Sequence, residues 1–347
     1  MQTKVVKIDS ANIDDAAMKE ACDLIRAGEL VAFPTETVYG LGADALHPEA
    51  SKKIYAAKGR PSDNPLIVHI SKFEDLVSIA REVPPQAKKL ADAFWPGPLT
   101  MIVWKNDRVP YETTGGMDTV AIRMPKHPVA LRLIEGSGCL IAAPSANTSG
   151  KPSPTEASHV ALDMDGRIPM ILDGGPVGIG IESTIVDLSE ETPMILRPGY
   201  ITQEMLQEVL GEKVCMDPGI IASDSTRKPK APGMKYKHYA PDAQVIVGTG
   251  SLPDMAAKLI AEYDRREAEG LTCIIFATEE TRCFYRGKRY VIIGERKNPL
   301  TLCESLFAQF RAQEGKADVI LCEALPETDM GLAYMNRLLR SAGFKTI

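Results

Sequence analysis

The sequence predicts an α/β protein with two domains. Short apolar runs typical of buried strands alternate with segments whose apolar residues recur at helical spacing. At 347 residues the chain is long enough for two or three domains, each with a core of its own. Composition changes between Thr226 and Tyr239, where six Lys, Arg or His residues, two prolines and one glycine occur without an acid. We interpret this segment as an extended linker.

The predicted boundaries follow from that change in composition. We expect a first domain over residues 1–212, a linker over 213–241 and a smaller α/β domain over 242–347.

The first domain begins with alternating helices and strands whose ends carry stop signals. Gly28 ends the first helix, the Trp95-Pro-Gly-Pro98 run ends another, and Thr202 is a candidate N-cap. We expect helices over 13–27, 49–57, 85–95, 155–162 and 202–210, and strands over 30–33, 66–70, 99–104, 119–125, 140–144 and 184–188. Residues 194–199 end the first region with Arg197 after an apolar run.

After residue 243 the alternation starts again. We expect strands over 244–247, 271–276, 290–293 and 317–322, with helices over 255–268, 302–312 and near 332–341. Strand and helix in strict alternation predict a small parallel sheet.

Composition and charge exclude few functions, but they bear on the binding partners and the cellular location that we expect. The net charge of −6 argues against a surface built for duplex nucleic acid, although a local basic patch is compatible with it. No apolar run reaches the roughly 18 to 20 residues of a membrane span, and the N-terminal residues lack a signal-peptide core. We therefore expect a cytoplasmic protein. The seven cysteines form no C-x-x-C pair, and no H-E-x-x-H or Walker A motif occurs.

The segment from Lys58 to Pro65 (Lys-Gly-Arg-Pro-Ser-Asp-Asn-Pro) places two cations in a proline-stiffened loop between a helix and a strand. Such a loop suits an anion, because loops between regular elements commonly carry binding residues. The structural alternative is a solvated basic turn.

Two other loops follow predicted strands and are rich in hydroxyls. Pro34-Thr-Glu-Thr-Val-Tyr-Gly40 leaves one strand, and its threonines either contact a substrate or satisfy local backbone groups. Ser145-Ala-Asn-Thr-Ser149 leaves another and precedes a helix, where phosphate binding competes with simple N-capping.

Arg123 lies among apolar residues of a predicted strand. A guanidinium keeps its charge at neutral pH, so a buried one requires an anionic partner or a solvent opening. A protein carboxylate and a substrate carboxylate are the alternatives.

These cations and hydrogen-bond donors occur without a protein nucleophile that is matched to a general base. Such a set favours a reaction at a nucleotide phosphorus, where positioning and charge neutralisation do most of the work. The alternative from another class is a non-catalytic RNA-binding module that uses the basic loops and the linker to bind tRNA or rRNA.

The motifs also resemble a known family. Lys58-x-Arg60 with Ser145-x-Asn147, and the stretch Pro34 to Gly40, are similar to hallmarks of the YrdC-type threonylcarbamoyl-AMP synthases. Residues 231–241 (Ala-Pro-Gly-Met-Lys-Tyr-Lys-His-Tyr-Ala-Pro) resemble the linker of the two-domain form, and Ala231 departs from the Ser found there.

The resemblance implies a twisted mixed sheet with an open concave site in the first domain and a Rossmann-like second domain. It implies a nucleotidyltransferase that makes L-threonylcarbamoyl-AMP from L-threonine, bicarbonate and ATP, with Mg²⁺ held through the nucleotide and no direct protein ligand. The product would serve N6-threonylcarbamoyladenosine formation beside the tRNA anticodon. A tRNA threonylcarbamoyl transferase machinery would receive it, so direct tRNA binding is not required.

Site residues carried over from the family fall into two groups. Lys58 and Arg60 would act on the phosphates as catalytic groups. The further ATP contacts would be Ser62, Thr119, Ser145, Asn147, Ser153, Arg197 and the linker's Tyr236. The threonine contacts would be Thr35, His69, Arg123, Ala143 and Ser183.

Overall fold

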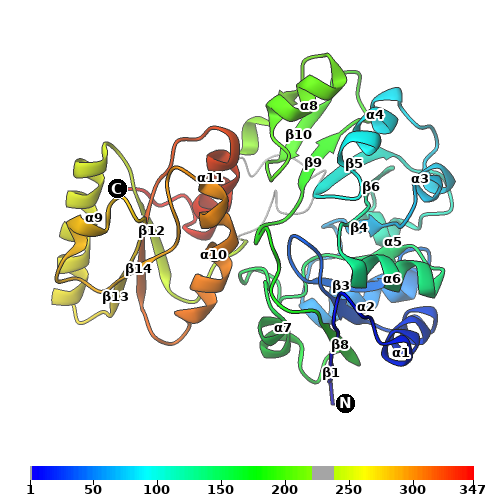
Figure 1. Cartoon of the computed structure of the whole chain (residues 1–347), viewed down its shortest axis with the longest axis horizontal. Coiled ribbons are helices and arrows are strands. Elements are labelled where there is room, and N and C mark those ends of the chain that lie inside the picture. The colour runs from blue at the N-terminus through cyan, green and yellow to red at the C-terminus, as the bar shows by residue number, and fades with distance from the viewer. Residues whose placement is uncertain (1, 221–237) are drawn as a thin grey trace. The chain divides into compact units, whose positions relative to one another are not determined.

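The computed structural model describes residues 2–220 and 238–347, and these residues form two compact units, each visible in Figure 1. Nearly all of the first unit lies within residues 2–220, and the second comprises residues 238–347 with the short segment 150–152. Tyr236 and most of the predicted linker lie outside the described residues. No helix in the described ranges is long and apolar enough to cross a membrane.

The first unit is built on a mixed sheet of eleven strands in the order β1-β8-β2-β3-β7-β4-β6-β5-β9-β10-β11. In chain order the strands are β1 (Lys4–Lys7), β2 (Val31–Phe33), β3 (Gly40–Asp44), β4 (Ile67–His69), β5 (Leu99–Trp104), β6 (Thr119–Arg123), β7 (Ile141–Ala142), β8 (Met170–Asp173), β9 (Thr184–Asp187), β10 (Met194–Arg197) and β11 (Cys215–Met216).

Parallel and antiparallel pairings both occur in this sheet. β4 pairs parallel with β6, whereas β7 and β4, and likewise β5 and β6, are antiparallel. The predicted mixed α/β sheet is therefore confirmed. β11 pairs with β10, so the first unit extends past the predicted boundary at residue 212.

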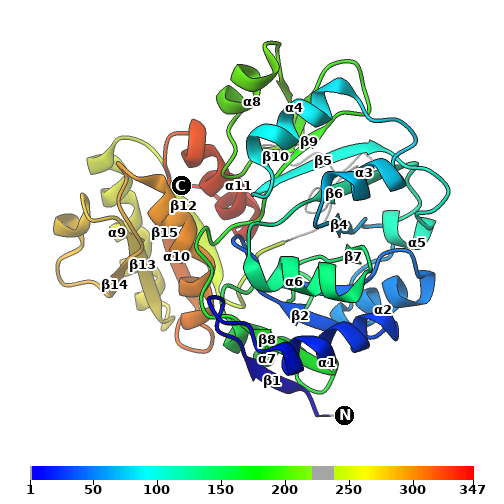
Figure 2. The ribbon, with the colours of Figure 1, turned by 45° about the vertical axis from the view of Figure 1, so that its right-hand side comes forward.

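Helices of the first unit cover the sheet with apolar faces. They are α1 (Asp15–Arg26), α2 (Pro48–Lys58), α3 (Phe73–Ile79), α4 (Pro85–Phe94), α5 (Tyr111–Thr114), α6 (Pro128–Ser137), α7 (Ala157–Met164) and α8 (Gln203–Leu210). α1 and α6 lie side by side in Figure 2, and their buried residues share one core with strands β2, β7 and β8. Thr202 caps α8 through a bond from the Met205 N–H, as predicted.

Several elements of the first unit were not predicted. β3 reads Gly-Leu-Gly-Ala-Asp and has none of the β-branched or aromatic residues that mark strands. It becomes a strand because β2 and β7 pair with it on both sides. The strands β1, β8, β10 and β11 and the helices α3, α5 and α6 were also missed, whereas α2 and β4 lie where they were expected.

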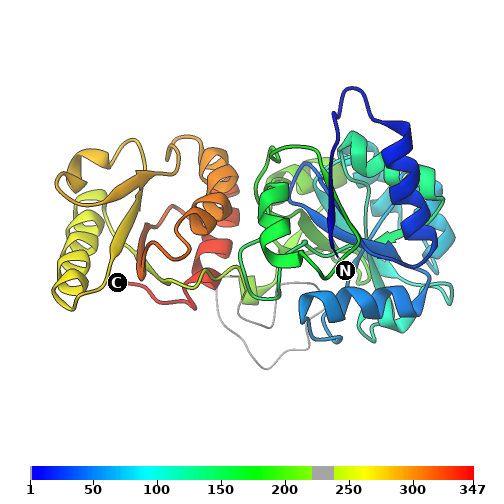
Figure 3. The same ribbon diagram turned by 90° about the horizontal axis from the view of Figure 1, so that it is seen from below.

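The second unit has the small parallel sheet that the sequence predicts. Its four strands have the order β12-β15-β13-β14. The elements are β12 (Gln244–Gly248), α9 (Leu252–Ala268), β13 (Cys273–Ala277), β14 (Tyr290–Ile292), α10 (Pro299–Ala312), β15 (Val319–Glu323) and α11 (Asp329–Ser341). Every pairing is parallel. Figure 3 shows α9 (yellow) on one side of this sheet and α10 and α11 (orange and red) on the other.

Candidate active site

The segment between β2 and β3 folds into a compact turn around the Thr35 hydroxyl. Thr35 Oγ1 accepts the N–H groups of Thr37 and Val38, each at 3.2 Å, and donates to the Val38 carbonyl at 2.6 Å. The Thr35 and Thr37 hydroxyl oxygens lie 2.8 Å apart. Thr35 therefore satisfies local backbone groups, which was one of the two interpretations left open by the sequence.

Two glycines that follow this turn let an aromatic ring cross the sheet. A Cβ on Gly42 would lie 2.7 Å from Phe33 Cε1, and one on Gly40 would lie 3.2 Å from Phe33 Cζ. Because both glycines lack that atom, the Phe33 ring packs edge-on against the His69 imidazole at 6.2 Å between centroids. The glycines of the motif thus shape the surroundings of a predicted site residue.

Arg123, at the end of β6, is buried and has an anionic partner. Its Nη2 lies 2.8 Å from Glu36 Oε1, close enough for an ion pair although the N–H direction is not that of a good hydrogen bond. Its Nη1 donates to Thr37 Oγ1 at 2.9 Å. Glu36 Oε2 accepts the Lys126 N–H at 3.0 Å, which anchors the carboxylate. In this structure the anionic partner of Arg123 is therefore a protein carboxylate, that of Glu36.

A second buried arginine lies against Ser183. Arg197 Nε donates to the Ser183 carbonyl at 3.0 Å, and its Nη2 donates to Ser183 Oγ at 3.2 Å. The Thr100 hydroxyl lies 2.8 Å from the same Oγ. Thr100 also lies opposite Arg123 in the register of β5 and β6, so the pairing of these strands places Ser183 and both arginines in one region of the sheet.

His69, at the end of β4, is held in the neutral form. Burial, and after it the nearby positive charge of Arg123, lowers the pKa of His69 to about 3. Nδ1 lies 3.1 Å from the Ile67 carbonyl, and a carbonyl only accepts, so a hydrogen bond between them places the ring proton on Nδ1. His69 and Arg123 are register partners on neighbouring strands. A neutral imidazole therefore lies beside a permanent cation.

Lys58 is the last residue of α2 rather than the first residue of a loop, and its side chain is 1% exposed. Its ammonium group donates to the carbonyl oxygens of Ser145 and Asn147 and lies 3.5 Å from Asn147 Oδ1. Ser145 Oγ donates to the same Oδ1 at 2.5 Å. The basic turn expected as the structural alternative is therefore excluded for Lys58, because a solvated turn would leave this ammonium in water.

Backbone bonds join three of the sequence motifs at one place. Ser145 forms a bridge with Gly40, and the Ala146 N–H donates to the Tyr39 carbonyl at 2.8 Å. The Ser149 N–H donates to the Lys58 carbonyl at 2.9 Å. The loop at 145–149 is thus held between the end of α2 and the turn that carries Thr37, the partner of Arg123. The structure assembles residues that lie more than 80 positions apart in the chain.

Comparison with known proteins agrees with this assembly. Residues 23–199 match the Sua5/YciO/YrdC family model, described as "Telomere recombination", and residues 201–343 match the model of the threonylcarbamoyl-AMP synthase C-terminal domain. The threonylcarbamoyl-AMP synthase of Bacillus subtilis is 48% identical over 98% of this chain and 96% of its own length. The one of Pyrococcus abyssi is 46% identical over 96% of both chains.

The chain belongs to the threonylcarbamoyl-AMP synthase family. It is accordingly a nucleotidyltransferase. A solved structure described as "Crystal structure of P. abyssi Sua5 complexed with L-threonine" matches with a TM-score of 0.94 and 45% identity, over 99% of both chains. Both the predicted family and the predicted fold class are confirmed.

The structure also shows where four other predicted site residues of this threonylcarbamoyl-AMP synthase family member lie. Arg60 is half-buried and donates to the carbonyls of Asn64 and Pro65 at 3.2 and 3.1 Å, so it braces its own loop. Ser62 is exposed in that loop. Thr119 is the buried first residue of β6, and Ala143 follows β7 and donates its N–H to the Ile67 carbonyl at 2.8 Å.

Glu36, Glu182 and Thr100 were not among the predicted site residues. Glu182 accepts the Ser153 hydroxyl and precedes Ser183, so it ties a predicted nucleotide contact to a predicted threonine contact. Glu36 had a usable signal, because it is the carboxylate of the Thr35-Glu36-Thr37 motif and the isolated Arg123 requires an anionic partner. Thr100 and Glu182 have no such signal, because only strand pairing brings them to the site.

Proposed function

We propose that the protein synthesises L-threonylcarbamoyl-AMP from L-threonine, bicarbonate and ATP and releases pyrophosphate. The observation that supports this most directly is the junction of Lys58, the Ser145 to Asn147 loop and the turn that contacts Arg123. It combines a buried ammonium, hydroxyl and amide groups and a buried guanidinium. Full-length relatives that carry the threonylcarbamoyl-AMP synthase name support the same reaction.

The proposed chemistry has two bond-forming steps. The amine of threonine attacks the carbon of bicarbonate and yields a carbamate and water. A carbamate oxygen then attacks the α-phosphorus of ATP, the bond to the bridging oxygen breaks, and pyrophosphate leaves with the electron pair. Both partners in the second step are anions. At ~4 Å their repulsion is about 4 kcal/mol at a near-surface effective dielectric, so fixed cations lower the barrier.

Arg123 is the proposed partner of the threonine carboxylate. Its planar guanidinium suits two-point contact with a carboxylate, and Glu36 holds it with one oxygen in this structure. Threonine would compete with Glu36 for these donors. Thr35, His69, Ala143 and Ser183 are the other proposed threonine contacts. The similarity to P. abyssi Sua5, which was solved in complex with L-threonine, supports this ligand.

The nucleotide is proposed to lie against Lys58 and the Ser145 to Asn147 loop. Arg60, Ser62, Thr119, Ser153, Arg197 and Tyr236 complete the proposed contacts. The Ser145 hydroxyl and the Asn147 amide, which are hydrogen-bonded to each other, would orient the phosphates, and Mg²⁺ would be held through the nucleotide with no direct protein ligand. The ion would supply charge neutralisation at the phosphates.

The product is proposed to serve N6-threonylcarbamoyladenosine formation in tRNA. A carbamoyl adenylate is a mixed anhydride that hydrolyses in water, so a transferase that accepts it soon after synthesis is the expected partner. In this scheme the protein itself needs no contact with tRNA.

Pyrophosphate release tests the reaction. Purified protein with ATP and Mg²⁺ should release pyrophosphate only when threonine and bicarbonate are both present. Release that is independent of threonine would refute the proposal, as would release that persists after bicarbonate is removed.

The proposed role of Arg123 has its own measurement. Arg123→Lys keeps the charge but loses the planar pair of donors, so we expect the KM for threonine to rise about tenfold or more, while the KM for ATP changes little. Tenfold corresponds to about 1.4 kcal/mol of binding free energy. Equal changes in both KM values would instead indicate a general distortion of the site.

The RNA-binding alternative gains no support from the geometry. Arg123 is 4% exposed and Arg197 is 6% exposed. An arginine that binds RNA phosphates or bases has to reach the surface. Salt-sensitive RNA binding without any pyrophosphate release would nevertheless revive this alternative.

A further inference from the structure

The second unit has a feature that the proposed reaction does not use. β12 and β15 are neighbouring parallel strands, yet the helices that follow them, α9 and α11, pack on opposite faces of the sheet (Figure 1). The loops after the two strands therefore diverge. In open α/β sheets such a divergence opens a crevice at the carboxyl ends of the strands, and ligands bind there.

A cavity of about 840 Å³ lies at this point. The loops after β12 and β15 line it, and the loop after β14 closes one side. Its principal side chains are Thr249, Leu252, Arg296, Lys297, Leu325 and Met335. The volume lies in the range of small-molecule sites, ~300–1,000 Å³. Leu325 and Met335 are buried and give the cavity an apolar wall.

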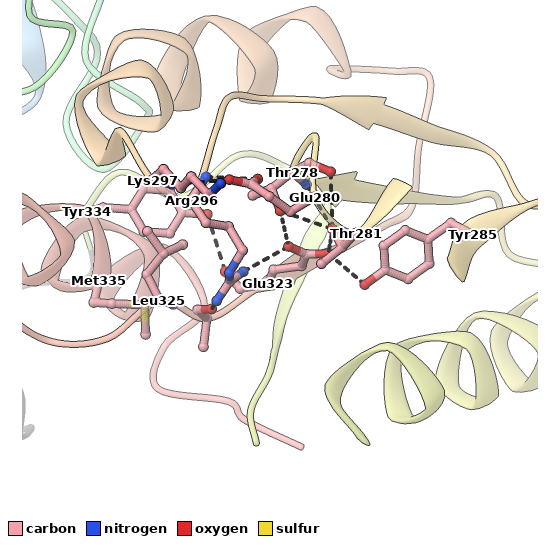
Figure 4. A network of polar contacts seen from close by, with 11 residues as sticks. Thr278, Glu280, Thr281, Tyr285, Arg296, Lys297, Glu323, Leu325, Tyr334 and Met335 are labelled. Carbon is pink, nitrogen blue, oxygen red and sulfur yellow. Dashed lines mark hydrogen bonds and ion pairs between the residues drawn. The ribbon is translucent and has the colours of Figure 1, made fainter. Parts of the chain in front are cut away.

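Arg296 is fixed in place by a buried carboxylate (Figure 4). Its Nη1 donates to Glu323 Oε2 at 3.0 Å and its Nη2 donates to the Ala324 carbonyl at 2.6 Å. Glu323, the last residue of β15, is 1% exposed. The bonds recorded for the Arg296 side chain use two of the five N–H groups of a guanidinium. Arg296 lines the cavity, so its other N–H groups are on a side chain that borders this space.

Three hydroxyl groups complete the support of Glu323. Thr278 and Tyr285 donate to it at 2.9 and 2.8 Å, and Thr281 donates to the same oxygen as Tyr285. With Arg296, the carboxylate has four donors, which is its full capacity. A satisfied network of this kind holds a side chain in one orientation at the end of the strands.

Lys297 places a second cation next to Arg296. The carboxylate of Glu280 accepts the backbone N–H groups of Arg296 and Lys297 at 3.0 and 3.2 Å, so this turn is held rigidly. Glu280 and Glu327 also line the cavity, but Glu280 is engaged with the backbone and Glu327 lies at the exposed rim. The two adjacent cations are the groups best matched to the oxygens of a dianion.

We propose that this crevice of the second unit binds a phosphate-bearing small molecule of up to nucleotide size. Arg296 and Lys297 contact the phosphate oxygens, and Leu325 and Met335 pack against the less polar part of the ligand. This site is separate from the proposed reaction and does not depend on it.

The methyl group of Met335 provides a local readout in the full chain. With ¹³C-methyl methionine, its resonance is assigned by its loss in Met335→Leu. Titration with inorganic phosphate, pyrophosphate and AMP should shift this resonance in a saturable way. A response to AMP alone identifies a nucleotide site, and equal responses to all three identify a site for free phosphate. The Lys297→Glu variant distinguishes binding at this crevice from binding at the first unit.

Lys297→Glu is the decisive variant, because Lys297 is exposed and takes no part in the Glu323 network. We expect it to weaken the response at least roughly tenfold. Lys316→Glu, an exposed lysine before the amino end of β15, is the matched control and should bind like the unmodified protein. The absence of a shift with every probe at about 10 mM would overturn the proposal, as would a shift that Lys297→Glu leaves unchanged.

Discussion

The position of Lys58 in the structure differs from the one that the sequence predicts. In the sequence it begins a basic loop, and in the structure it ends α2 with its ammonium group buried against the 145–149 loop. Burial of a cation is costly unless oxygen atoms surround it. The backbone carbonyls of Ser145 and Asn147 provide them here, and a phosphate would add further oxygens in the proposed complex.

We expect Lys58→Ala to lower kcat by roughly 10²- to 10³-fold, as the loss of one preorganised donor commonly does. The measurement is pyrophosphate release under saturating substrates. Lys53→Ala is the control, because Lys53 lies on the same helix, is exposed and pairs with Glu29 at 2.7 Å. If Lys58→Ala unfolds the protein at assay temperature, the role of Lys58 is structural.

His69 makes the free energy of unfolding depend on pH. Its pKa is about 3 in the folded protein and 6.5 in the ordinary reference state. Between these values the unfolded chain binds a proton that the folded chain does not, so stability falls as pH decreases from about 6.5 toward 3. The slope approaches about 1.4 kcal/mol per pH unit for one such group.

Urea unfolding of the protein and of His69→Asn between pH 7 and pH 5 measures this contribution. We expect the protein to lose more stability than the variant over this range. The difference between the two isolates His69 from the other titrating groups, including His127, whose pKa burial also lowers. Parallel curves would show that His69 has the same pKa in the folded and unfolded states.

At the scale of elements, β3 demonstrates that a strand depends on its neighbours. Its sequence has weak strand propensity, but it lies between β2 and β7 and is nearly fully buried. Its glycines are required by the Phe33 ring that crosses them. The turn before β3 carries Glu36 and Thr37, so the position of β3 also sets the partners of Arg123.

We therefore expect Gly42→Ala to destabilise the first unit by about 1–3 kcal/mol, the usual result of overpacking. The added Cβ would lie 2.7 Å from Phe33 and 2.8 Å from Ile141 Cγ2. Gly178→Ala is the control, because nothing lies within 4 Å of its Cβ position. Equal stability of the two variants in urea would show that Phe33 moves aside freely.

For the whole molecule, the division into two units predicts separate cores. The first unit has a core around α1 and α6, and the second has one around α9, β13 and β15. Each sheet is complete within its own unit. A change in the second core should therefore act locally.

Glu323→Gln tests this expectation. Loss of the charge breaks the buried pair with Arg296, and we expect a cost of about 3 kcal/mol. Hydrogen exchange should accelerate in peptides from β12, β13 and β15, while β5 and β6 keep their protection. Loss of protection in both sheets would show that the two units unfold together.

Much of this molecule is predictable from local patterns. Alternating apolar runs, caps such as Thr202 and stops such as Gly28 predict most helices and strands, and the second sheet follows from its strict alternation. Lys58, Arg123 and Ser145 stand out because a charge or hydroxyl cluster interrupts an apolar context. Two of the elements that were not predicted depend on distant strands: β3 lacks local strand propensity and pairs with β7, and β1 is only four residues long and pairs with β8.

The sequence alone determined the two-domain α/β architecture, the family and the cationic character of the site, because these depend on local periodicity and on motifs of adjacent residues. Tertiary structure decided which groups meet. It paired Arg123 with Glu36, buried Lys58 against Ser145 and Asn147, and set Arg296 on Glu323. Such contacts depend on strand order and register. These cannot be inferred from the sequence alone while the strand pairings are unknown.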